Sequence, residues 1–96
     1  MDIDKIQLIL RDSAPYLKSE YDVESIGIFG SFVRGEQNSE SDLDLLVTFF
    51  RKPGLFKFIS LENYLSDLLG IKVDLVMPSA LKNRIGKQIR SEVISV

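Results

Sequence analysis

The sequence predicts an α/β (α+β) domain built on a small mixed sheet of three to four strands flanked by helices. Segments with the two-residue period of strands alternate with segments that have the helical period, and a helix separates the second strand from the third. The length of 96 residues suits one small domain, so residues 1–96 are expected to form a single unit without a second domain.

The first segment predicts an amphipathic helix. Apolar residues fall at roughly helical spacing over residues 2–17. Asp2 or Asp4 lies near the start, where a carboxylate favours the positive end of the helix dipole. Pro15 has no backbone N–H, so it is expected to end or kink the helix. The helix is expected to pack on the sheet and is assigned no chemistry.

A strand over Val23–Phe29 leads into a turn that contains two glycines. Gly30 permits the positive φ or the close approach that a tight strand-to-helix turn needs. Ser31 is the expected N-cap of a one-turn helix over residues 32–34, and Gly35 is placed to end it.

The second half of the chain completes the alternation of strands and helices. The predicted elements are a strand over Leu43–Phe50, a helix over Phe56–Leu69 closed by Gly70, a strand over Val73–Met77, a helix over residues 80–92 and a short strand over Val93–Val96. In the last helix Arg84, Lys87 and Arg90 recur every three residues and form a basic stripe. This stripe is either a solvated face or a surface for an acidic partner or substrate phosphates.

Asp42 and Asp44 open the second strand. Because side chains alternate along a strand, both point to one side about 6.6 Å apart along the chain, while Leu43 and Leu45 point to the core. Like charges this close repel each other, and a divalent cation between them would offset the repulsion. Oxygen ligands favour a hard ion such as Mg²⁺, which takes one or two carboxylates plus substrate phosphates. The sequence has no His and no Cys, which excludes a zinc hydrolase of the His or Cys type.

The turn before this strand has the features of a phosphate site. Free backbone N–H groups at the helix start after Gly30 and Ser31 attract phosphate oxygens, and Arg34 can add a bidentate charge contact. Taken singly, Gly-Ser is a common turn and Asp-x-Asp can be a solvated strand end. In combination, with ten residues between Ser31 and Asp42, they favour a phosphate site followed by a metal site.

This arrangement resembles the Gly-Ser, ten residues, Asp-x-Asp motif of the polymerase-beta-like nucleotidyltransferase superfamily, and most closely its minimal nucleotidyltransferase (MNT) branch. Members carry a third Asp on a later strand, and Asp74 within Lys72-Val73-Asp74-Leu75-Val76 matches that position. Asp74 also points away from the core, because Val73 and Leu75 share the opposite face. The likeness runs from the leading helix to this strand. Val33 departs from the family, since many members carry a small residue there.

The resemblance implies the nucleotidyltransferase fold and the transfer of a nucleotide from ATP, with two Mg²⁺ ions. The implied site residues are Asp42, Asp44 and Asp74 as catalytic and metal-binding carboxylates, and Gly30, Ser31 and Arg34 as nucleotide-binding residues. Members of this size are antitoxins encoded with a HEPN-domain ribonuclease toxin, and they adenylylate a tyrosine of that partner. The chain is therefore expected to be a protein adenylyltransferase of a type VII-like toxin–antitoxin system, as a homo-oligomer or as a hetero-oligomer with the toxin.

Two other functions stay open. The chain can neutralise its toxin by binding alone, or it can transfer a nucleotide to a small hydroxylated molecule such as an aminoglycoside. A net charge of −2 argues against a surface that binds nucleic acid stably. The sequence shows no signal peptide and no apolar run long enough to span a membrane, so the cytoplasm is the expected location.

Overall fold

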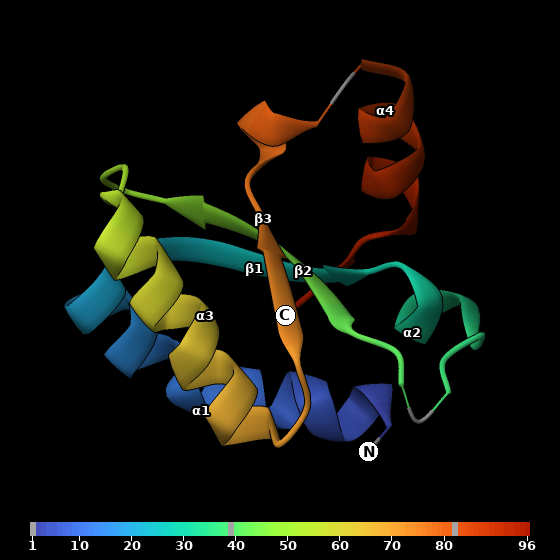
Figure 1. Cartoon of the computed structure of the whole chain (residues 1–96), viewed down its shortest axis with the longest axis horizontal. Coiled ribbons are helices and arrows are strands. Elements are labelled where there is room, and N and C mark those ends of the chain that lie inside the picture. Colours follow the sequence, from blue (N-terminus) through green and yellow to red (C-terminus); the bar gives the residue numbers. More distant parts are fainter. Residues whose placement is uncertain (1, 39, 82) are drawn as a thin grey trace.

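Helices and strands alternate along the chain in the computed structural model, which describes residues 2–38, 40–81 and 83–96 (Figure 1). The elements are α1 (Ile3–Tyr21), β1 (Val23–Phe29), α2 (Ser31–Arg34), β2 (Leu43–Phe49), α3 (Leu55–Leu69), β3 (Val73–Val76), the 3-10 turn η1 (Pro78–Ala80), α4 (Asn83–Glu92) and β4 (Ile94–Ser95). Each predicted helix and strand is present. The strand over Val23–Phe29 has the predicted bounds, the first helix ends four residues later than predicted, and the other bounds differ by at most three residues.

The described residues form one mixed sheet of four strands in the order β3-β2-β1-β4. β1 is antiparallel to both β2 and β4, whereas β2 and β3 are parallel. The register pairs Phe29 of β1 with Asp44 of β2, and Asp44 with Asp74 of β3. The end of β1 and the starts of β2 and β3 therefore meet at one end of the sheet. The predicted fold class is confirmed.

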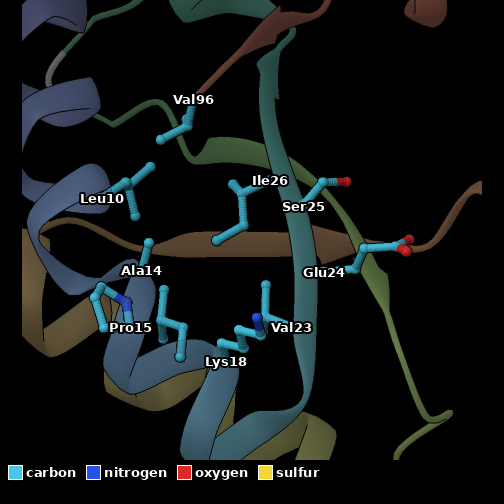
Figure 2. A pocket seen from close by; sticks show the side chains of 10 residues that line it. Leu10, Ala14, Pro15, Lys18, Val23, Glu24, Ser25, Ile26 and Val96 are labelled. Atoms are coloured by element: carbon cyan, nitrogen blue, oxygen red, sulfur yellow. The ribbon is translucent and has the colours of Figure 1, made fainter.

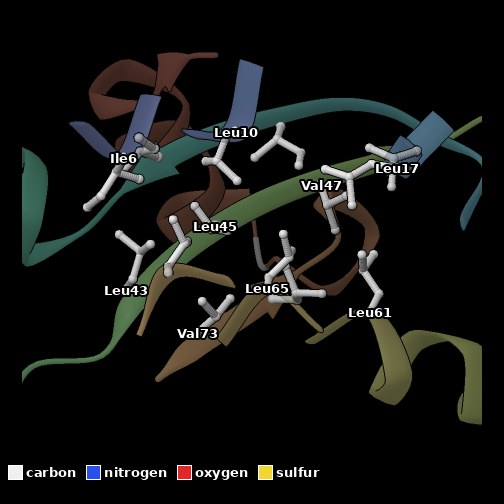
Figure 3. Close-up of a cluster of buried hydrophobic side chains, with 14 of the residues drawn as sticks. Ile6, Leu10, Leu17, Leu43, Leu45, Val47, Leu61, Leu65 and Val73 are labelled. Carbon is white, nitrogen blue, oxygen red and sulfur yellow. The ribbon is translucent and has the colours of Figure 1, made fainter. Parts of the chain in front are cut away.

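The hydrophobic core lies between the sheet and the two long helices, α1 and α3, which lie side by side against one face (Figure 1). Figure 3 shows side chains from both helices meeting those of β2 and β3. The most deeply buried residues are Ile6, Leu10, Leu17, Ile28, Leu43, Leu45, Val47, Leu61, Leu65, Leu69 and Val73. Burying a side chain of this size contributes about 1.5–3 kcal/mol, so this layer fixes which face of each strand points inward.

The first helix does not end at Pro15 but continues to Tyr21, four residues beyond the predicted end at Leu17. A proline inside a helix removes one hydrogen bond, and this loss is outweighed by packing, because Leu10 and Leu17 are buried on either side of it. The predicted carboxylate at the start of the helix is confirmed. Asp2 is the N-cap, and its side chain accepts a hydrogen bond from the N–H of Lys5.

The residue that caps α2 was also predicted wrongly. Gly30, not Ser31, is the N-cap, and Ser31 is the first helical residue without a side-chain capping bond. The reason is the backbone of Gly30, whose φ of 81° and ψ of −151° make the turn itself, in a region open essentially to glycine alone. Gly35 ends the helix in the left-handed conformation, as predicted.

The C-terminal helix starts later than residue 80. Residues 78–80 form η1 instead, and α4 begins at Asn83. Of the predicted basic stripe, Lys87 is exposed, whereas the side chains of Arg84 and Arg90 lie outside the described residues. In the part of the chain that the structure describes, no helix combines the length and apolarity that a membrane span needs.

Candidate active site

The three predicted carboxylates lie at the same end of the sheet. Asp44 and Asp74 are direct register partners on parallel neighbouring strands, which are spaced about 4.8 Å apart. Burial alternates along β2, with Leu43 and Leu45 inside, so Asp44 points to the face opposite the core. Asp42 precedes it by two residues, just before β2 begins, and is near enough to act electrostatically on Asp44. The predicted common face is thus confirmed for Asp44 and Asp74, whereas Asp42 lies just outside the strand.

The electrostatics of Asp44 reflect this crowding. Burial raises the pKa of Asp44, and the neighbouring carboxylates of Asp74 and Asp42 raise it further, whereas Arg34 acts in the opposite direction. A cation placed beside the cluster would remove the repulsion that raises this pKa. The repulsion that the spacing of the aspartates predicted is therefore one of the causes that raise the pKa of Asp44.

Gly30 brings the turn after β1 directly against these carboxylates. A Cβ at this position would overlap Oδ2 of Asp44 and lie 3.3 Å from its Cβ, and the positive φ disfavours any other residue. The predicted close approach is therefore confirmed, and it is the approach of the Gly30 backbone to the carboxylate of Asp44. The backbone of the turn therefore lies directly beside the carboxylate of Asp44.

The N–H groups of α2 are only partly used within the turn. Those of Val33 and Arg34 donate to the carbonyl oxygen of Gly30, at 3.1 and 3.2 Å. The donors at the start of the turn that can serve an anion are then the N–H groups of Ser31 and Phe32. Val33, the departure from the family pattern, is half-buried and packs against the core, so its larger side chain is accommodated.

Arg34 makes contacts that no sequence signal marked. Its guanidinium donates to the carboxylates of Glu36 at 3.3 Å and Glu92 at 3.1 Å. Hydrogen bonding to Glu36 raises the pKa of Arg34, and both carboxylates add to the effect. Glu92 lies 58 residues away in sequence, so only the fold reveals this partner. The ion pair ties the end of α4 to the turn after β1.

Lys72 is a second residue that the sequence did not single out for chemistry. Its ammonium lies 3.8 Å from the carboxylate of Asp42, and its side chain is 79% exposed. An ion pair between solvent-exposed groups is weak, so Asp42 can exchange this partner for another cation at little cost.

The donor set fits a hard divalent cation that the substrate helps to bind. Within residues 2–38, 40–81 and 83–96, no group of three or more acidic side chains encloses a metal position as it stands. Mg²⁺ needs only one or two carboxylates and completes its shell with water and substrate phosphates. Asp42 and Asp44, with Asp74 beside them, supply those carboxylates next to the turn where phosphates would lie.

A groove of about 450 Å³ lies elsewhere, between α1 and β1. Figure 2 shows Leu10 and Ala14 of α1 facing Ile26 of β1 across it, while Glu24 and Ser25 point away from the helix. None of the predicted site residues lines this groove. The carboxylates therefore belong to a different part of the surface, at the end of the sheet.

Proteins similar to this chain are described as nucleotidyltransferases or protein adenylyltransferases, which agrees with a site of carboxylates beside a phosphate-binding turn. The family described as "Nucleotidyltransferase domain" matches residues 10–96. A candidate protein adenylyltransferase of Methanocaldococcus jannaschii, MJ0128, is 53% identical over 95 residues, which cover 98% of this chain and 97% of the relative. The protein adenylyltransferase MntA of Thermococcus cleftensis is 47% identical over 96 residues, covering 100% of this chain and 97% of the relative.

Two solved structures extend the likeness to the fold. A candidate minimal nucleotidyltransferase superposes with a TM-score of 0.81 and 33% identity, covering 100% of this chain and 97% of the other. A chain of a toxin–antitoxin complex solved with AMP-PNP superposes with a TM-score of 0.70 and 25% identity, covering 99% of this chain and 72% of the other. The chain is thus a member of the nucleotidyltransferase domain family, in its minimal branch.

Proposed function

We propose that this nucleotidyltransferase is an Mg²⁺-dependent protein adenylyltransferase that uses ATP to modify a tyrosine of a cognate HEPN ribonuclease toxin, and so acts as an antitoxin. The observation that carries the chemistry is the register of Asp44 with Asp74, beside the turn at Gly30. The names of the similar proteins support protein adenylylation, and the complex with AMP-PNP supports a toxin partner and a nucleotide substrate.

The turn is assigned to the triphosphate. The N–H groups of Ser31 and Phe32 and the hydroxyl of Ser31 would donate to the β- and γ-phosphates, where Gly30 keeps the backbone close to the carboxylates. Arg34 would support the same phosphates after exchanging one of its carboxylate partners for them.

The carboxylates are assigned to the metal and the acceptor. Asp42 and Asp44 would hold the ions, and Asp74 would complete the site near the acceptor hydroxyl. When bound, two Mg²⁺ ions would neutralise phosphate charge and orient the attacking and leaving oxygens. No His is present, so a carboxylate is the available proton acceptor, and this role is assigned to Asp74, which is exposed whereas Asp42 and Asp44 are half-buried.

The reaction then balances without a further reagent. The tyrosine oxygen attacks the α-phosphorus of ATP, and the bond between that phosphorus and the oxygen bridging to the β-phosphate breaks. The hydroxyl proton passes to Asp74, and pyrophosphate leaves with the electron pair of the broken bond. The products are the AMP-modified protein and pyrophosphate.

Two alternatives differ in what they require of the site. An antitoxin that acts by binding alone has no use for a carboxylate at Asp44, where burial and the nearby charges of Asp74 and Asp42 raise its pKa. Transfer to an aminoglycoside needs a pocket for the acceptor beside the carboxylates, and none of the predicted site residues lines the groove between α1 and β1. The first observation favours catalysis over binding alone, and the second favours an acceptor that brings its own surface, such as a protein.

The test is transfer of label from ATP in the presence of Mg²⁺ and the protein encoded next to this one. Label at the α-phosphate is expected on the neighbour, and label at the γ-phosphate is not. Asp44→Asn should abolish the transfer, whereas Asp67→Asn, an exposed carboxylate on α3, should leave it intact.

Other outcomes separate the alternatives. A stable complex with the neighbour but no transferred label would support neutralisation by binding and refute adenylylation. Label on an aminoglycoside without any protein partner would identify the small-molecule transferase. Full transfer by Asp44→Asn would refute the assignment of the carboxylates.

A further inference from the structure

β3 carries Asp74, although it lies at the edge of the sheet. One side of an edge strand has no strand partner, so its N–H groups need other acceptors or water. In the parallel pair with β2, the carbonyl of Lys72 points inward and accepts from the N–H of Leu43 at 2.8 Å. The backbone N–H groups of the alternate residues, Val73 and Leu75, therefore point away from β2.

Two side chains of α3 accept these outward N–H groups. The N–H of Val73 donates to the hydroxyl oxygen of Ser66, and the N–H of Leu75 donates to the carboxylate of Glu62, both at 3.0 Å. The two bonds lie on either side of Asp74 in sequence. We call Glu62 and Ser66 together the α3 edge cap.

The α3 edge cap is itself held in place. The hydroxyl of Ser66 donates to the carbonyl oxygen of Glu62 at 2.9 Å, which directs its lone pairs toward Val73. Leu61 and Leu65, the neighbours of these residues on α3, are fully buried. The acceptors are thus fixed by core packing and by the helix, and the bond to the Glu62 carboxylate is charge-assisted.

We propose that Glu62 and Ser66 are positioning residues that keep Asp74 opposite Asp44. This inference rests on the proposed metal and acceptor role of Asp74. β2 holds one side of β3, and the α3 edge cap holds the other, so the short strand has a single register. Without the cap, β3 would have partners on one side only, and the exposed carboxylate of Asp74 would lose its fixed distance from Asp44.

The rival explanation is that the cap only protects an edge strand from unwanted pairing. That role predicts lower stability when the cap is removed but an unchanged metal dependence in the folded fraction. The positioning role predicts that metal dependence changes in the folded protein, because supporting hydrogen bonds behind metal ligands are typically worth 10–100-fold in metal affinity or activity.

The experiment compares Ser66→Ala and Glu62→Leu, which remove the acceptors, with Ser66→Thr and Glu62→Gln, which keep an acceptor oxygen. Ser60→Ala is the matched control, because Ser60 lies on the same helix but its hydroxyl pairs with that of Tyr21. Amide hydrogen exchange at residues 73 and 75 reports on the bonds directly. The Mg²⁺ concentration for half-maximal nucleotide transfer reports on the site.

Removing either acceptor is expected to lower the protection of the matching amide about tenfold and to raise the Mg²⁺ requirement about tenfold or more. The conservative variants should restore most of both, and Ser60→Ala should change neither. Lost protection with an unchanged Mg²⁺ requirement would overturn the proposal while leaving the function intact. If Glu62→Leu does not fold, Ser66→Ala, compared with Ser66→Thr, decides on the same two readings.

The failure of the proposed function is a separate result. Asp74→Asn in the wild-type background is expected to abolish transfer while preserving the protection of both amides. Full transfer by Asp74→Asn would remove the role on which the positioning proposal rests. In that case, the hydrogen-exchange data would show only that Glu62 and Ser66 stabilise the edge strand.

Discussion

Replacing Asp44 by Asn should make the metal-free protein more stable while abolishing its activity. In the absence of a cation, Asp44 is a half-buried carboxylate in register with Asp74 on the neighbouring strand, and Asp42 lies two residues before it. Asn has nearly the same shape but no charge. The substitution therefore removes repulsion and leaves the packing of β2 unchanged.

The size of the effect follows from the strand spacing. Two unit charges about 5 Å apart interact by about 3.3 kcal/mol at an effective dielectric constant of about 20, and by about 0.8 kcal/mol in water. Asp74 is exposed, which places the pair near the lower value, and Arg34 offsets part of the repulsion. A gain of about 1 kcal/mol is expected, which raises Tm by about 4–8 °C for a domain of this size.

The assay is thermal unfolding followed by circular dichroism, first with EDTA and then with Mg²⁺ and a non-hydrolysable ATP analogue. A ligand at about 100 times its Kd stabilises the wild type by about 2.7 kcal/mol, so the order of the two proteins should reverse. Asp67→Asn serves as the control, since an exposed substitution should stay within about 0.5 kcal/mol. A lower Tm for Asp44→Asn in EDTA would refute the electrostatic reasoning.

The pH dependence of stability gives a second test of whether the charge of Asp44 destabilises the metal-free protein. The pKa of Asp44 is raised in the folded state by burial and by Asp74 and Asp42, so the folded protein holds this proton more tightly than the unfolded chain. Stability from this group is greatest at low pH and falls as the pH rises from the unfolded-state pKa through the folded one. The advantage of Asp44→Asn should therefore vanish below about pH 4.

Three further predictions concern the turn and its supports. Gly30→Ala should lower stability by about 1–3 kcal/mol in urea unfolding and abolish transfer, because of the positive φ and the overlap with the adjacent carboxylate; normal activity would contradict the close approach. Glu92→Gln should free Arg34 for phosphates and lower the KM for ATP about twofold, as expected for a pair worth about 0.5 kcal/mol; a higher KM would show that the pair orients the guanidinium instead. The hydrogen bond from Lys57 lowers the pKa of Asp22. The stabilisation from this pair should therefore be present above the unfolded-state pKa of Asp22 and lost as the pH falls through the folded-state pKa. Equal acid sensitivity of Lys57→Met and the wild type in thermal unfolding would contradict this.

Much of the candidate site was predictable because it depends on local alternation. Once Leu43 and Leu45 are buried, the two-residue period of a strand places Asp44 on the other face. The same argument applies to Asp74. The requirement for glycine at position 30 was also visible, although the atom it must avoid, Oδ2 of Asp44, was not.

The parts that the sequence did not reveal depend on contacts between distant segments. The continuation of α1 through Pro15 depends on packing against the sheet, which outweighs a local preference. The partnership of Arg34 with Glu92 joins elements far apart in the chain. The edge cap of Glu62 and Ser66 follows from the position of β3 at the edge, which the pattern of apolar residues does not specify.

The most direct measurement is a titration with Mn²⁺, a paramagnetic substitute for Mg²⁺, in the presence of a non-hydrolysable ATP analogue. Amide signals in a ¹H–¹⁵N spectrum are broadened near the ion. The proposed site predicts broadening at residues 30–31, 42–44 and 74 and sharp signals at Gly54, beyond the opposite end of β2. Excess Mg²⁺ should reverse the effect, and Asp44→Asn should prevent it. Broadening centred elsewhere, or unchanged in Asp44→Asn, would contradict a metal–nucleotide site built on these carboxylates.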